Sequence, residues 1–244
     1  MKKKYISLIL CLSGFLLTSV AQNPVTDPLM PETKKTREKT KTTKNVEIIR
    51  DRMMFDFFHV FWLHAPAELN IQKKFHPGCN FSLMWDFKKP GQSVSFGLGV
   101  GVTYYTQFSN GRLLQSSEDG VMRYYLLQTD SFSLNRLNMV SCNIPLEFRY
   151  RHRSGFKFSI GARLGLIAEL SQSYKGQDLE QTGKSLYLRD FKLENKMSYH
   201  FDVYARIGWK YVSVYYGYQI TSLFEKDKGP LAIPMSLGVT WNIF

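Results

Sequence analysis

The chain has 244 residues, a formal net charge of +12, 44% hydrophobic residues and a mean hydropathy of −0.24. This length supports one sizeable domain or two small ones, and the hydropathy is too low for a polytopic helical membrane protein. A charged fraction of 21% argues against a wholly disordered chain, and 3 cysteines argue against a disulfide scaffold or a zinc cluster. The 14 tyrosines and 18 phenylalanines favour strands and membrane interfaces.

The first 21 residues have the pattern of a secretory signal peptide. Lysines occupy positions 2–4, residues 5–17 carry no charge, and the small residues Ser19 and Ala21 stand where a signal peptidase cleaves. The sequence therefore predicts export, with a mature chain that begins at Gln22.

Two other roles for this segment are weaker. A lipoprotein signal would use Cys11, but Leu10 stands where a small residue is needed and the cysteine comes early. A retained anchor helix would need a longer apolar run.

Residues 22–52 are predicted to form a flexible, disordered periplasmic tail. Prolines at positions 24, 28 and 31 interrupt regular structure, and residues 34–41 are basic and of low complexity. Such a run can contact phosphate or anionic lipid, although a solvated spacer is the favoured interpretation. Nucleic acid is not an expected partner, because the chain is exported and no aromatic residue interleaves with these lysines.

From residue 53 onward, apolar and polar residues alternate with a period of two, which is typical of β-strands with two different faces. The clearest case runs from Met197 to Trp209, where every odd position is apolar or aromatic. Eight strands are predicted in all, at residues 53–63, 79–87, 92–111, 141–151, 156–166, 197–209, 212–221 and 233–243.

The uncharged stretch 92–111 is long enough for a membrane helix. Gly97, Gly99 and Gly101 alternate strictly with larger apolar residues there, and repeated glycine is poor for a helix but suits the crowded inside of a small barrel. A strand is therefore predicted. The first strand alternates less cleanly because His59 falls on its apolar face, for which a bulge or a membrane-interface position is a better explanation than a metal ligand.

The connections alternate between short and long. Short links follow the second, fourth and sixth strands, and long links span about 64–77, 106–133 and 173–196. This asymmetry is typical of an outer-membrane barrel, with short periplasmic turns and long external loops. The predicted fold class is therefore all-β, an eight-stranded antiparallel transmembrane β-barrel over residues 53–244. A soluble sandwich or lipocalin would put its apolar faces inward and lacks this loop asymmetry.

If the apolar face meets lipid, the polar face fills the lumen. An eight-stranded barrel is just wide enough for side chains to fill it, and an unpaired buried charge is costly. An interior salt-bridge network is thus favoured over a conducting pore. The predicted lumen charges are five acids and five bases: Asp56, Asp86, Glu147, Glu169, Asp202, Arg149, Arg151, Lys157, Arg163 and Arg206.

The chain resembles the small outer-membrane β-barrel proteins of Bacteroidota. The resemblance covers about residues 50–244 and rests on the signal peptide, the eight alternating strands and three segments: Ile144–Tyr150 (IPLEFRY), Leu223–Pro230 (LFEKDKGP) and Ser236–Phe244 (SLGVTWNIF). Size and layout are similar to PorT-type barrels, which implies an accessory role in type IX secretion. Terminal Phe244 suits barrel-assembly recognition, whereas Asn242 and Thr240 stand where apolar residues are commoner.

Three function classes follow, and the first is preferred. It is a non-enzymatic outer-membrane barrel that supports an envelope or secretion machine, with outer-membrane lipid and envelope proteins as partners of its tail and loops. The second is a general structural or adhesive barrel, and the third is a barrel enzyme acting on lipid or peptide. No catalytic, cofactor-binding or metal site and no small-molecule substrate is predicted.

An enzyme would need a nucleophile beside a base at the outer rim. The loop residues of suitable type are His64, His76, Asp119, Asp130, Asp178 and Glu180, and no spacing links any of them to a particular serine. They are therefore interpreted as solvated. His200 and Asp202 share a lumen face and could form a relay, but a packed polar core is the preferred interpretation.

Overall fold

The structure is a computed structural model, and it describes residues 52–65, 75–87, 92–116, 119–127, 132–177, 185–190 and 193–243. All of these lie within one compact unit, Asn45–Phe244. The predicted signal peptide, the tail up to residue 51 and terminal Phe244 lie outside the described residues. Within the described part of the chain, no helix has the length and apolar character needed to cross a bilayer.

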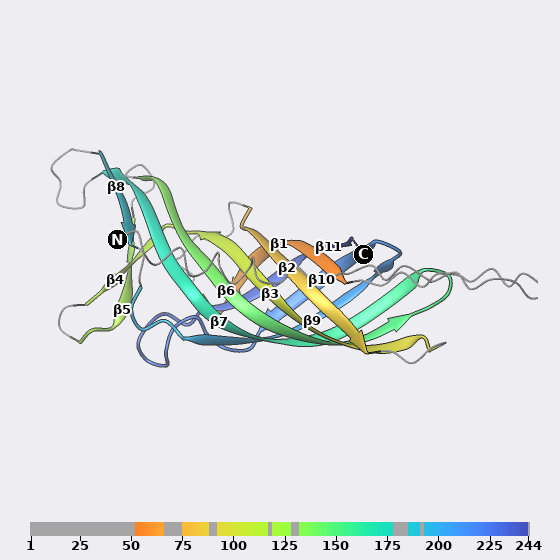
Figure 1. Cartoon of the computed structure of the whole chain (residues 1–244). Coiled ribbons are helices and arrows are strands. Elements are labelled where there is room, and N and C mark those ends of the chain that lie inside the picture. Colours follow the sequence, from red (N-terminus) through yellow and green to blue (C-terminus); the bar gives the residue numbers. More distant parts are fainter. Residues whose placement is uncertain are drawn as a thin grey trace, which may run out of the picture. The chain divides into compact units, whose positions relative to one another are not determined.

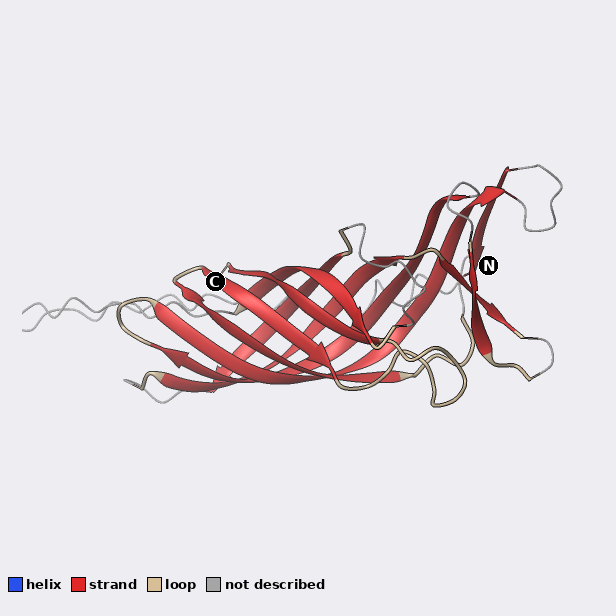
Figure 2. Cartoon of the chain, turned by 180° about the vertical axis from the view of Figure 1, so that it is seen from behind, coloured by secondary structure: helices blue, strands red, loops and turns tan. Residues whose placement is uncertain are grey.

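Eight strands close into a barrel in which every pairing is antiparallel (Figures 1 and 2). They are β1 (Met53–Leu63), β2 (Pro77–Phe87), β3 (Val94–Phe108), β6 (Phe132–Arg151), β7 (Phe156–Gln177), β9 (Tyr199–Trp209), β10 (Val212–Gln219) and β11 (Ile233–Asn242). Around the ring the order is β6-β3-β2-β1-β11-β10-β9-β7, and β7 pairs back with β6. The all-β fold and the eight-stranded barrel expected from the sequence are confirmed.

The barrel has two different ends. At the turn end, residues 88–93, 152–155 and 210–211 make the short connections; at the loop end, the strands are joined through 64–76, 109–131, 178–198 and 220–232. The last turn is tight, and Lys210 takes a positive φ of 49° to close it. The alternation of short and long links is as the sequence indicated.

Two of the predicted long loops contain further strands. β4 (Gly111–Gln115) and β5 (Met122–Leu126) form a separate hairpin, and β8 (Ser185–Asp190) pairs with the far end of β7. These segments are short, so their alternation was too brief to stand out from loop sequence. Figure 1 shows all three at the loop end of the barrel.

β6 and β7 are longer than the sequence indicated, at 20 and 22 residues. Their pairing continues past the barrel as far as Phe132 and Gly176, beyond the last residue at which β7 pairs with β9. The alternating segments 141–151 and 156–166 therefore stop short of the loop end of these strands, whose ends lie close to the limits of the long links expected at about 106–133 and 173–196. The extra length carries β8.

A register shift in the β6–β7 pairing corrects one predicted lumen residue. Ser141 pairs with Ile167 and Val140 pairs with Glu169, so Ala168 is one residue in excess on β7. An extra residue of this kind reverses which positions face inward. Glu169 consequently lies outside the lumen, where it is half-buried and 3.8 Å from Arg189.

His59 needs no bulge, because β1 pairs with β11 without interruption from Met54 to Leu63. Its ring stacks on Phe75 and His76, and its Nδ1 accepts a hydrogen bond from the backbone amide of His76 at 2.8 Å. The histidine thus anchors the end of the first long connection.

Candidate functional site: the polar interior and its apolar cap

Polar and charged side chains fill the turn half of the barrel. Nine of the ten predicted lumen charges point inward, and five strands supply them: β1, β2, β6, β7 and β9. The inward-facing charges are Asp56, Asp86, Glu147, Asp202, Arg149, Arg151, Lys157, Arg163 and Arg206. Because alternation puts one residue in two inside, the sequence located these groups correctly, with Glu169 as the exception.

Arg206 on β9 crosses the lumen to two carboxylates on other strands. Its Nη2 is 2.7 Å from Asp56 Oδ2 on β1, and its Nη1 donates to Glu147 Oε1 on β6. Asp56 is completed by Asn80 Nδ2 at 2.8 Å and by the hydroxyl of Thr240 at 2.6 Å. All of these groups are buried, where an unpaired charge would be costly. Each of the three charged groups has an ion-pair or hydrogen-bond partner that offsets this cost.

The rings of Tyr204 and Tyr215 pack against the guanidinium of Arg206, with centroids 4.7 and 5.3 Å from its Cζ. The ring of Tyr204 also packs against the guanidinium of Arg163, whose Cζ lies 4.8 Å from the ring centroid. Cation–π contacts of this kind add to the ion pairs where water is excluded. The two arginines are therefore held by aromatic faces as well as by carboxylates.

A second group of ion pairs lies nearer the turn end. Arg149 Nε donates to Glu147 Oε2 at 2.5 Å, and its Nη1 is 2.7 Å from Asp86 Oδ1. Arg151 Nη2 approaches the other oxygen of Asp86 at 2.8 Å. Glu147 thus links this group to Arg206, and the charges form one connected network.

A serine, a histidine and an aspartate form a chain of hydrogen bonds on the loop-end side of this network. His200 Nδ1 is 2.9 Å from Asp202 Oδ1, and its Nε2 is 2.9 Å from the Ser141 hydroxyl. The order matches the Ser-His-Asp arrangement used for acyl transfer. Sequence analysis paired His200 with Asp202 but missed Ser141, which lies on β6, separated from β9 by β7.

The surroundings of this triad are those of a packed core. Ser141 and His200 are 0% and 1% exposed. The ring of His200 occupies the space over Gly165, where an added Cβ would clash with Nε2. A nucleophile must meet its substrate, and here the hydroxyl is enclosed by protein. The chain of hydrogen bonds therefore ties β6 to β9 across β7.

Two cavities in the interior are small. One, of about 20 Å³, is lined by residues that include Glu147, Arg149 and Arg206, and the other, of about 30 Å³, by residues that include Tyr105, Arg163 and Asp202. Volumes of this size hold about one or two water molecules. They leave the interior filled along the charge network.

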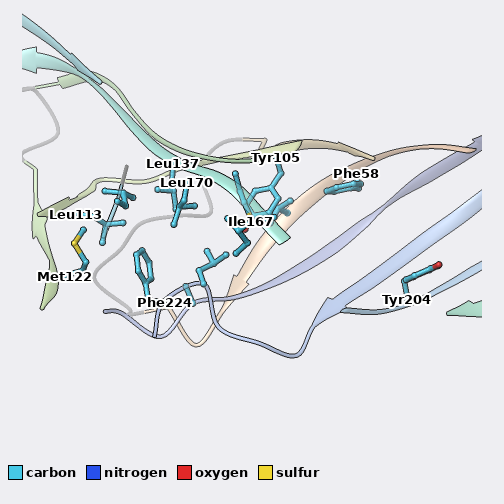
Figure 3. Close-up of a cluster of buried hydrophobic side chains, with 14 of the residues drawn as sticks. Phe58, Tyr105, Leu113, Met122, Leu137, Ile167, Leu170, Tyr204 and Phe224 are labelled. Carbon is cyan, nitrogen blue, oxygen red and sulfur yellow. The ribbon is translucent and has the colours of Figure 1, made fainter. Parts of the chain in front are cut away.

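The loop half of the interior contains a cluster of apolar side chains. Buried side chains from the barrel wall meet others from the hairpin and from the connections, and we call this cluster the cap (Figure 3). Its members from the connections and hairpin are Leu113, Met122, Leu193, Leu223, Phe224 and Ala232. Leu223 and Phe224, at the start of the LFEKDKGP segment, are 0% and 2% exposed.

Backbone hydrogen bonds join the parts of the cap to one another. The amide of Met122 donates to Lys228 O at 2.9 Å, and the amide of Met197 donates to Leu223 O at 2.9 Å. Leu113 N donates to the side chain of Gln172 on β7 at 3.1 Å. The hairpin and the last long connection are therefore fastened over the barrel.

Two titratable groups at the loop end are perturbed. The ammonium of Lys196 donates to Ile167 O at 2.9 Å, and burial lowers its pKa. The amide of Val121 donates to Asp119 Oδ1 at 3.1 Å, which lowers the pKa of this exposed carboxyl, with a further contribution from Arg123.

The structure separates the other rim residues named from the sequence. His64 is exposed at the end of β1, whereas His76 is buried and its Nδ1 accepts a hydrogen bond from the Phe108 amide at 3.0 Å. The expectation that His76 is solvated is thus wrong, because the ring packs against His59 and Phe108. Asp130, Asp178 and Glu180 lie outside the described residues.

Among the residues that the structure describes, no group of three or more histidine, cysteine, aspartate or glutamate side chains is arranged to hold a metal ion. The fold and interior together define a closed eight-stranded antiparallel β-barrel with a filled lumen. No protein-family model matches the sequence, and no curated protein shows significant similarity to it.

Proposed function

We propose that this chain is an integral outer-membrane barrel with a sealed interior, which acts without catalysis as an accessory component of an envelope machine. The observation that carries the proposal is the outer surface of the barrel, which is covered by apolar side chains. Soluble proteins rarely leave so large a continuous apolar surface to water. A lipid bilayer is the environment that this surface fits.

The apolar surface is ordered along the strands. Aliphatic residues predominate in its middle, including Leu98, Val100, Ile144, Leu146, Ile160, Val214 and Val239, and the exposed rings of Phe57 and Tyr216 also lie near the middle of their strands. Exposed aromatic residues gather toward the turn end (Trp85, Phe87, Phe96, Trp209, Tyr211 and Trp241) and toward the loop end (Phe61, Phe75, Tyr104 and Tyr199). Two aromatic girdles around an aliphatic band are typical of outer-membrane barrels.

The sealed interior and the cap favour a role outside transport through the barrel itself. Arg206 and its carboxylates block the lumen at one level, and the cap blocks it at another. What remains for interaction is the exterior of the molecule, above all the hairpin and β8 at the loop end. Together with the resemblance to PorT-type barrels, this supports an accessory role in type IX-like secretion.

The native thiol of Cys142 gives a direct test of membrane insertion. Cys142 is exposed on the outer face of β6, where its neighbours across the sheet are Val102 and Leu166. In intact membranes, a charged, water-soluble thiol reagent should leave this thiol unmodified and should modify it after denaturation. The test uses a variant in which Cys79→Ser leaves Cys142 as the thiol of the barrel. A second variant that adds Ser154→Cys, at the exposed 152–155 turn, is the reactive control. Equal labelling of both thiols would contradict insertion.

Cell fractionation and cysteine labelling test the compartment and the topology. A mature chain beginning at Gln22 should fractionate with the outer membrane and should migrate differently on gels before and after heating. A cysteine at Gln177 should be labelled on whole cells, and one at Ser154 should not. The reverse labelling pattern would invert the proposed orientation.

The role in an envelope machine is tested by purification in mild detergent. The tagged mature protein should retain a stoichiometric set of secretion proteins, identified by mass spectrometry. A deletion of the β4–β5 hairpin that still inserts should lose them. Recovery of the inserted barrel without any partner would favour a general structural role in the envelope.

A further inference from the structure

Exposed charges are distributed unequally between the two ends of the barrel. At the turn end, the exposed charged residues that the structure describes are Arg52, Arg153 and Lys210, and none is acidic. At the loop end, the exposed and half-buried charges are mixed, with acids such as Asp119 and Glu225 paired to Arg123 and Lys228. The difference marks the turn end as a surface for an anion.

Two of these cations lie on adjacent turns. The amide of Lys210 donates to the carbonyl of Gly155 at 2.8 Å, which ties the 209–211 turn to the turn that carries Arg153. Lys210 and Trp209 both pack close to Gly155. A Cβ added to this glycine would lie 3.0 Å from Lys210 Cγ and 3.3 Å from the indole nitrogen of Trp209. Lys210 and the indole of Trp209 therefore lie beside the 152–155 turn, which carries Arg153.

This area is bordered by exposed aromatic rings. Trp209 and Tyr211, on either side of Lys210, are 52% and 49% exposed. Tryptophan and tyrosine prefer the level of lipid headgroups, and lysine and arginine beside them meet the phosphates.

We propose that Arg153 and Lys210, with the ring of Trp209, bind the phosphate of an anionic phospholipid headgroup in the leaflet at the turn end. This inference rests on the proposed membrane location and adds a specific ligand chemistry to it. The cations supply charge-assisted hydrogen bonds to phosphate oxygens, while the indole packs beside the glycerol region. A basic residue near an anionic surface strengthens association by about fivefold.

The test uses the full mature chain, reconstituted in phosphatidylcholine vesicles. A variant with Trp62, Trp85 and Trp241 changed to Phe leaves Trp209 as the fluorophore. Brominated phosphatidylglycerol should quench Trp209 several-fold more effectively than brominated phosphatidylcholine at the same mole fraction. Arg153→Gln with Lys210→Gln should abolish this preference, whereas Arg123→Gln with Lys228→Gln, a matched loss of two charges at the loop end, should preserve it.

A second measurement does not depend on the tryptophan variant. Native mass spectrometry of the otherwise unaltered protein should show retained phosphatidylglycerol, which the double Gln variant loses. If the lipid is the ligand, millimolar inorganic phosphate should not change the stronger quenching by phosphatidylglycerol. If phosphate abolishes that difference between the two lipids, the site binds the free anion instead. Equal quenching by both lipids in an inserted, heat-modifiable barrel would overturn the lipid site alone, while failure to insert would overturn the proposed location.

Discussion

The two halves of the barrel interior are filled in opposite ways. In the turn half, the strands themselves provide the filling, as Asp56, Glu147 and Arg206 reach one another from β1, β6 and β9. In the loop half, the connections fold back and bury Leu223 and Phe224 against the wall and the hairpin. Short turns have no side chains to spare for the lumen, so the turn half must be filled from its own wall.

This difference separates two kinds of contribution. Burying the apolar cap removes side chains from water, which is the main stabilising effect in folding. The ion network satisfies charges that would otherwise be costly, and removing one partner of a buried ion pair is strongly destabilising. We therefore expect the turn half to be sensitive to loss of one partner and the loop half to be sensitive to loss of volume.

The largest effect is expected for Arg206→Ala. The substitution leaves Asp56 and Glu147 buried without their shared cation, and breaking a buried pair costs about 3–5 kcal/mol of folding free energy. The midpoint of unfolding in detergent should fall accordingly, and the variant should show no new conductance in planar bilayers. Arg123→Ala, which removes an exposed pair, is the control and should cost less than about 1 kcal/mol. Stable single-channel steps from the wild-type protein, together with a fully stable Arg206→Ala, would show a wet lumen.

Leu223→Ala tests the cap. The side chain is fully buried, and a buried Leu→Ala change costs about 2–5 kcal/mol because a cavity remains. We expect a lower thermal midpoint and faster proteolysis of the hairpin, with the barrel still resistant. Leu231→Ala, whose side chain is 53% exposed on the same connection, should change neither. Equal sensitivity of the two positions would mean that the cap does not form.

Ser141→Ala tests whether the serine has a structural or a chemical role. The change leaves His200 Nε2 without its partner and should cost about 1–3 kcal/mol. A fluorophosphonate probe should fail to label the folded wild-type protein, because the hydroxyl is enclosed. Ser198→Ala, at an exposed position, is the stability control. Labelling that depends on Ser141 and His200 would instead reveal a nucleophile.

The smallest effect concerns pH at the loop end. The hydrogen bond from the Val121 amide holds the pKa of Asp119 below its ordinary value. A lowered carboxyl pKa stabilises the fold above the ordinary pKa, and this contribution is lost as the pH falls through the folded-state pKa. NMR titration of the Asp119 carboxyl should give a midpoint below that of an unstructured aspartate. A midpoint at the ordinary value would mean that the turn is open in solution.

Much of the barrel could be predicted from the sequence because strand alternation is a local property. The side chains of an extended backbone alternate between two faces, so the inward position of Asp56 or Arg206 follows from its neighbours along the chain. The glycine-rich stretch 92–111 was identified as a strand on the same grounds, and β3 occupies Val94–Phe108. The exposed apolar face required no knowledge of pairing.

Other features depended on contacts between distant segments. The bulge at Ala168 exists only in the pairing of β6 with β7, and it places Glu169 outside. Likewise, β8 is a strand because the overhang of β7 offers it a partner, and His76 is buried because it lies against β1 and β3. Nothing in the local sequence of these residues distinguishes them from loop residues.

By itself, the sequence determined the number of barrel strands, the alternation of short and long connections and, with the exception of Glu169, which of the charged residues on the strands face the lumen. Tertiary structure alone decided which charges meet, since closure of the ring brings Arg206 to Asp56, 150 positions away. It also joined Ser141 to His200 and buried Leu223 and Phe224 of the LFEKDKGP segment in the cap. The physical reason is that face alternation follows from backbone geometry within one strand, whereas pairing across a lumen depends on how all eight strands are staggered when the barrel closes.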